Sequence, residues 1–198
     1  REYCGNPGRS GHVLSLRASE KIYECRQTLA SFFGSDKPEN VVFTLNTTYA
    51  LNLAIKSLYT PGSHVLISNM EHNSVYRPVW ELKARGEVTF DTFNVLQPAD
   101  RILAELRAKC TPNTKLLVMM HASNLCGKVF PIREIGSFCR KHGILFVVDA
   151  AQSAGVIDID MKRCFIDALC APAHKGLYGP QGLGFVIFGD AQPNRTVI

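Results

Sequence analysis

The sequence has no uninterrupted apolar run of the roughly 20 residues that a helix needs to cross a bilayer. It also has no block of basic residues interleaved with aromatic ones, and its formal net charge is only +5. We therefore expect neither a membrane nor a nucleic acid as partner. Charged residues make up 20% and hydrophobic residues 46% of the 198 positions, which is typical of a folded globular domain.

The seven cysteines show no CxxC spacing, and their number is odd. This pattern predicts neither a zinc site nor a disulfide framework, so we expect no bound metal. Most of the cysteines fall in segments that we predict as helix or strand, where a free thiol packs as a small apolar side chain. These features favour a reducing, cytoplasmic setting.

Helical and strand patterns alternate along most of the chain. Residues 1–19 are rich in Gly, Ser and Arg without any period, so we expect an N-terminal loop there and a single domain over residues 20–198. Helices are predicted at about 20–33, 46–58, 74–85, 98–109 and 131–143, and strands at 41–45, 64–68, 87–93, 115–120, 144–148, from 167 and at 184–188.

This alternation predicts the class of fold. Strands that alternate with helices form an α/β fold with a mostly parallel sheet sandwiched between helices, and nearly all-apolar strands agree with burial on both faces. The Gly/Pro-rich turn at 179–182 predicts that the last two strands form an antiparallel pair.

Polar residues gather just after the predicted strands, where ligands bind in sheets of this kind. Polar residues without a shared function would also occur at the opposite strand ends, so we interpret this gathering as a binding site. The residues are Asn46, Thr47, Thr48, Glu71, His72, Asn73, Ser123, Asn124, Asp149, Gln152, His174 and Lys175.

Lys175 and Asp149 could bind two different groups of one cofactor. Lys175 follows a short apolar strand and precedes a glycine-rich turn, and Asp149 ends the apolar run Phe146–Val148. A lysine there can form an imine with a carbonyl cofactor, and a neighbouring carboxylate can keep a pyridine nitrogen protonated. Together they predict pyridoxal 5'-phosphate (PLP) as the cofactor. Taken singly, Lys175 could be a solvated surface residue and Asp149 the cap of a helical turn.

Other polar residues of the group could contact the same cofactor. Thr47 and Thr48 open a predicted helix, where N–H groups and the helix dipole bind anions such as a phosphate, although plain capping is an equal alternative. His72 could stack on a cofactor ring or assist proton transfer, or be a loop histidine. Asn124 and Gln152 could donate hydrogen bonds to a phenolate oxygen, or serve turns.

Five stretches together resemble the class V aminotransferase group of fold-type-I PLP-dependent enzymes, and within it cysteine desulfurases and selenocysteine lyases. They cover residues 47–52, 67–73, 121–127, 148–152 and 174–180. The resemblance implies the large domain of a PLP-dependent transferase-like fold. It also implies a homodimer that holds the cofactor near the subunit interface.

The resemblance implies roles for eight residues. Lys175 would carry the cofactor and, with His72, would be catalytic, while Asp149 would pair with the pyridinium nitrogen. His72 would stack on the ring. The remaining contacts would be Thr47, Thr48 and His174 with the phosphate, and Asn124 and Gln152 with the phenolate side.

The chain departs from the family pattern in two respects. Pro172 stands where many relatives carry a phosphate-binding Ser or Thr. Family enzymes also have a further N-terminal segment and a C-terminal small domain, which supplies an arginine for the substrate carboxylate. In desulfurases the later part of the chain also supplies a sulfur-accepting cysteine. No stretch here matches these parts, so we expect a fragment without the small domain that is catalytically incompetent alone.

The reaction implied by the resemblance is cysteine desulfuration. L-cysteine would become L-alanine, its sulfur would remain as a persulfide on an enzyme cysteine, and a sulfur-acceptor protein could receive it. Selenocysteine lysis and transamination are alternatives that differ in substrate contacts outside this chain. A non-catalytic PLP-fold module is a further alternative, although it would have no need of both Lys175 and Asp149.

Overall fold

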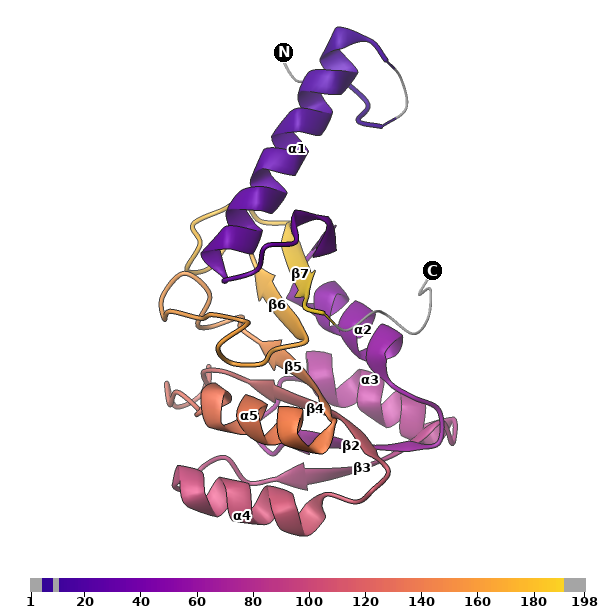
Figure 1. Cartoon of the computed structure of the whole chain (residues 1–198), viewed down its shortest axis with the longest axis vertical. Helices are drawn as coiled ribbons and strands as arrows, with labels where there is room; N and C mark the ends of the chain where they lie inside the picture. The colour runs from indigo at the N-terminus through magenta and orange to yellow at the C-terminus, as the bar shows by residue number, and fades with distance from the viewer. Residues whose placement is uncertain (1–4, 9–10, 191–198) are drawn as a thin grey trace.

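The structure, a computed structural model, describes residues 5–8 and 11–190, and its elements follow the predicted alternation (Figure 1). The helices are α1 (Val13–Phe32), α2 (Thr47–Leu58), α3 (Asn73–Ala84), α4 (Ala99–Lys109) and α5 (Ile132–His142), with a 3-10 helix at Pro38–Asn40. The strands are β1 (Val41–Thr44), β2 (Ser63–Ser68), β3 (Val88–Phe93), β4 (Thr114–Met120), β5 (Leu145–Asp149), β6 (Ala168–Pro172) and β7 (Gly184–Phe188).

The strands form one sheet in the order β1-β7-β6-β5-β4-β2-β3. Strand β7 is antiparallel to both of its neighbours, whereas the other pairs are parallel. The predicted mostly parallel sheet and the late antiparallel pair are therefore confirmed. Because β1 and β6 both run against β7, β1 points the same way as the parallel strands and ends at the same edge of the sheet.

Helices cover both faces of the sheet (Figure 1). Alternate residues of β4 point to opposite faces, so Leu116 and Val118 pack in the cluster that holds the apolar residues of α2 and α3. Leu117 and Met119 pack in the other cluster, with α4 and α5. Burial on both faces explains why the strands are almost entirely apolar.

Helix α1 starts earlier than predicted, so the expected loop over residues 1–19 was wrong from Val13 onward. A local cap, which apolar periodicity does not reveal, starts the helix: the side chain of His12 accepts a hydrogen bond from the N–H of Ser15 at 3.3 Å. The helix projects away from the body of the molecule (Figure 1), and Phe32 of its predicted apolar face is 56% exposed.

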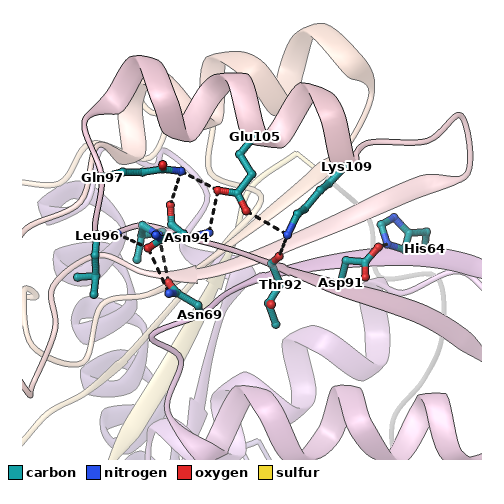
Figure 2. Close-up of polar contacts among 10 residues, drawn as sticks. His64, Asn69, Asp91, Thr92, Asn94, Leu96, Gln97, Glu105 and Lys109 are labelled. Carbon is teal, nitrogen blue, oxygen red and sulfur yellow. Dashed lines mark hydrogen bonds and ion pairs between the residues drawn. The ribbon is translucent and has the colours of Figure 1, made fainter.

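A polar network fixes the outer strand β3 to α4, at the far edge of the sheet (Figure 2). Lys109 donates to the carbonyl oxygen of Thr92 at 2.5 Å and forms an ion pair with Glu105 at 3.0 Å. Glu105 also accepts hydrogen bonds from the side chain of Gln97 at 2.6 Å and the N–H of Asn94 at 3.3 Å. This network holds the end of β3 without contributing to the pocket described below.

The cysteines that the structure describes are all free, and Cys4 lies outside the described residues. Burial raises the pKa of the Cys170 thiol well above its ordinary value, so this side chain packs as a neutral apolar group in β6. Within residues 5–8 and 11–190, no helix is long and apolar enough to cross a membrane. The same residues contain no group of three or more His, Cys, Asp or Glu side chains that could hold a metal ion.

Gly136 of α5 allows the helix to pack closely against the segment before β6, because a Cβ at this position would overlap the carbonyl oxygen of Cys164. We expect Gly136→Ala to lower the free energy of unfolding by about 1–3 kcal/mol through overpacking. This loss should outweigh the helix propensity of about 1 kcal/mol that alanine gains over glycine. Urea denaturation measures the difference, with Ser137→Ala on the same helix as the control. Equal midpoints for the two variants would contradict the expected clash.

Candidate active site

A pocket of about 210 Å³ opens where the strands of the parallel part of the sheet end, beside the first turns of α2 and α3. The eight residues to which a cofactor role was assigned all line this one pocket, although the individual roles stay predictions. They are Thr47, Thr48, His72, Asn124, Asp149, Gln152, His174 and Lys175. Glu71, Asn73 and Ser123, which belong to the same polar group in the sequence, do not line it.

The strand register brings the ends of β4, β5 and β6 together. Met120 of β4 lies opposite Asp149 of β5, and Asp149 lies opposite Cys170 of β6. The N–H of Ala150 donates to the carbonyl oxygen of Cys170 at 2.9 Å, which continues the pairing beyond β5. Met120, Asp149 and Pro172 therefore line the same pocket from three strands.

Asp149 is a buried carboxyl group of the pocket, with an exposed fraction of only 5%. Burial raises its pKa, whereas a hydrogen bond from the N–H of Ala151 and the charges of His72 and Lys175 act in the opposite direction. The Ala151 bond, 2.8 Å to Oδ1, shows that Asp149 also serves the following turn. Asp149 thus supports the turn and lines the same pocket as His72 and Lys175.

Two glycines place Lys175 beside the segment that follows β5. A Cβ at Gly155 would overlap the carbonyl oxygen of Gly176, and a Cβ at Gly176 would lie 2.5 Å from the carbonyl oxygen of Ala154. The two loops are therefore in direct backbone contact, which only glycine permits. This contact brings Lys175 and Gln152 to the same pocket.

The first turn of α2 forms another wall. Asn46 caps the helix by accepting a hydrogen bond from the N–H of Tyr49 at 3.0 Å, so capping is not the role of Thr47 or Thr48. The first N–H groups of a helix have no intrahelical acceptor, and the helix dipole makes this end positive. This wall can therefore bind an anion.

His72 is both the N-cap of α3 and part of the pocket wall. Its Nδ1 accepts a hydrogen bond from the N–H of Ser74 at 3.1 Å and lies 2.8 Å from the Ser74 hydroxyl oxygen. That oxygen lies 2.7 Å from the hydroxyl oxygen of Thr48. Ser74 was not among the predicted site residues, although it directly follows the polar residues 71–73 in the sequence.

Glu71 lies behind the pocket and had no predicted role. One of its carboxyl oxygens accepts hydrogen bonds from the N–H of Met120 at 2.8 Å and from the Ser68 hydroxyl, and the other is buried without a partner. Burial raises the pKa of Glu71 to about 8, and the neighbouring charge of Asp149 acts in the same direction. Glu71 is therefore mostly neutral at pH 7, so it does not oppose the ionisation of Asp149.

We expect Glu71→Gln to flatten the pH dependence of stability. The folded pKa of about 8 lies above the ordinary value of 4.5, so the folded state holds a proton between these values that the unfolded state has lost. The free energy of unfolding should therefore fall as pH rises from 5 to 8, by up to about 1.4 kcal/mol per pH unit for this group. Glutamine mimics the protonated acid, so the variant should lose this part of the slope.

Denaturant titrations between pH 6 and 8 measure this difference, with Glu81→Gln as the control. The pKa of Glu81 is lowered by a hydrogen bond and ion pair with Lys56, so its carboxylate is ionised in both states over this range and its removal should not change the slope. Parallel slopes for the parent chain and Glu71→Gln would show that Glu71 is ionised in the folded state.

Two solved structures share this arrangement of strands and helices. The apo structure of a cysteine desulfurase from Thermococcus onnurineus NA1 matches with a TM-score of 0.85 at 30% identity, covering 96% of this chain and 48% of that one. The structure of a C-DES variant with glycine covalently linked to its PLP cofactor matches with a TM-score of 0.81 at 27% identity, over 92% and 49%. The predicted fold, that of PLP-dependent transferases, is confirmed.

The sequence profile of the family described as aminotransferase class-V matches residues 1–195. The chain belongs to this family, as its motifs predicted. A curated relative from Methanothermobacter thermautotrophicus, named "Probable cysteine desulfurase", is 35% identical over an alignment of 203 residues. That alignment covers 98% of this chain and 49% of the relative. The chain thus spans about half the length of the curated relatives it matches.

Proposed function

We propose that the chain is the cofactor-binding part of a PLP-dependent cysteine desulfurase, which converts L-cysteine to L-alanine and leaves the sulfur as a persulfide on an enzyme cysteine. The observation that carries this proposal is that Lys175 and Asp149 line one pocket together with the first turn of α2. Family membership and the names of the similar proteins support the reaction.

The pocket has the chemistry that PLP requires. Its volume of about 210 Å³ is below the roughly 300–1,000 Å³ of typical ligand pockets, which suits a small ring cofactor better than a dinucleotide. A buried carboxylate, a lysine amine and a helix N-terminus match a pyridinium nitrogen, a carbonyl carbon and a phosphate. Pro172 offers no hydroxyl, so Thr47, Thr48 and His174 would hold the phosphate with the N–H groups of α2.

Several residues would act on the cofactor and the substrate in this proposal. When bound, PLP would supply an electron sink for the reaction. An ionised Asp149 would pair with the ring nitrogen and keep it protonated. Lys175 would hold the carbonyl carbon through Nζ and, once free, would hold or move a proton at Nζ. His72 would pack on the ring and be a second group that moves a proton, and Asn124 and Gln152 would donate hydrogen bonds to the phenolate side.

We also propose that the whole protein is a cytoplasmic homodimer that passes sulfur to an acceptor protein. Exposed apolar side chains on the loops around the pocket support an interface there, since Tyr178 is 95%, Leu125 78% and Val156 69% exposed. The carboxylate-binding arginine and the sulfur-accepting cysteine would come from the part of the relatives that this chain does not match. The free cysteines agree with a reducing compartment.

Binding of PLP to Lys175 tests the proposal directly. Added PLP should turn the chain yellow, and borohydride should remove the visible band and leave a reduced PLP adduct on Lys175 that peptide mass spectrometry locates. Lys175→Ala should lose the reducible linkage. Lys115→Ala, which removes an exposed lysine at the opposite end of the sheet, should keep it. A folded chain that remains colourless with excess PLP, or an unchanged adduct in Lys175→Ala, would refute the assignment.

Asp149→Asn tests the other end of the pocket. The amide keeps the hydrogen bond from Ala151 but loses the charge that attracts a pyridinium, so the Kd for PLP should rise about tenfold or more. Absorbance titration measures the affinity, with the exposed Asp158→Asn as the control. Equal affinities for the two variants would show that Asp149 does not contact the cofactor.

The reaction itself is tested in the full-length protein. Equal amounts of alanine and sulfur from L-cysteine would establish desulfuration, whereas a keto acid product would establish transamination. Activity on selenocysteine alone would favour a lyase.

A further inference from the structure

We propose that Ser74 is a positioning residue that couples an anion bound at Thr48 to the location of the proton on His72. This inference rests on the proposed function, because the anion is the phosphate group expected at the first turn of α2. Ser74 lines the pocket and is only 7% exposed. Its hydroxyl oxygen contacts one side chain from each of two helix N-termini, Thr48 of α2 and the cap His72 of α3.

The contacts define a continuous chain of polar atoms. The hydroxyl oxygens of Thr48 and Ser74 are 2.7 Å apart, and the Ser74 oxygen is 2.8 Å from Nδ1 of His72. Both are ordinary hydrogen-bond distances. Each hydroxyl has a single proton to donate, so the direction of one hydrogen bond determines the direction of the next.

Without an anion, the protons point toward His72. Nδ1 accepts the N–H of Ser74 at 3.1 Å, so this ring nitrogen carries no proton. The Ser74 hydroxyl can then donate to the same nitrogen, and the Thr48 hydroxyl donates to the Ser74 oxygen. In this state the Thr48 proton is committed to Ser74 and does not face the pocket.

An anion at the first turn of α2 reverses this direction. Hydrogen bonds to a charged acceptor are stronger than those between neutral groups, so the Thr48 hydroxyl donates to the anion. The Thr48 oxygen then accepts the Ser74 proton, and the Ser74 oxygen becomes an acceptor toward His72. The proton of the neutral imidazole moves from Nε2 to Nδ1 and completes the chain, while the N–H of Ser74 loses its acceptor.

Ser74 acts only through His72 in this scheme, because it is not expected to touch the cofactor or the substrate. It places the imidazole proton on Nδ1 only when the phosphate end of the pocket is filled.

The location of the proton can be measured in the chain without PLP, with inorganic phosphate as the probe. In the ¹⁵N-labelled chain at constant pH, phosphate should move the Nδ1 resonance of His72 from the range of an unprotonated ring nitrogen to that of a protonated one. A His72→Gln sample identifies the resonance. The backbone amide resonances of Thr47 and Thr48 report phosphate binding independently.

Two substitutions of Ser74 separate the coupling from simple packing. In Ser74→Ala, phosphate should still move the amide resonances of Thr47 and Thr48 but leave Nδ1 of His72 unprotonated. Ser74→Thr keeps a hydroxyl and should restore the response. Thr48→Val should raise the Kd for phosphate about tenfold, because it removes one hydrogen bond to a charged ligand.

The outcomes distinguish this inference from the proposed function. If phosphate moves the amides of the parent chain but not Nδ1, or if Ser74→Ala responds like the parent, the coupling is wrong and the anion site stands. If phosphate moves neither, both the coupling and the phosphate site of the proposed function are wrong.

Discussion

The burial of Asp149 is the constraint on which the candidate site depends. A carboxylate that is 5% exposed costs free energy unless hydrogen bonds or cations compensate for the loss of water. The N–H of Ala151 provides one compensation, and the charges of His72 and Lys175 provide another. The neutral state of Glu71 removes a competing negative charge. A pyridinium nitrogen would complete this set of partners.

The elements around Asp149 meet because their backbones approach closely. The contact between Gly155 and Gly176 joins the loops after β5 and β6, and Gly184 at the start of β7 leaves room for the backbone of Asn46 before α2. A side chain at any of these glycines would push a pocket wall outward. The geometry of the site is thus set by backbone packing, and the polar side chains are placed on it.

The sequence predicted the fold class and the members of the pocket well, for a physical reason. Strand and helix periodicities are local, and parallel strands place their carboxyl ends at one edge, so residues such as Asn124 and Lys175 were expected to converge. The start of α1 was wrong because the His12 cap is a side-chain contact without a periodic signal. No role was predicted for Ser74 or Glu71, because the hydrogen bonds that give them one are made to residues of other elements.

The sequence by itself determined which segments form strands and helices, and which polar residues follow them, because these properties depend on neighbours a few positions away. Only the tertiary structure decided that β1 lies beside β7, that Ser74 connects Thr48 with His72, and that Glu71 lies behind the pocket near Asp149. Such contacts join residues far apart in the chain. Their energies arise from burial and hydrogen bonding that exist only after the sheet and its helices have packed.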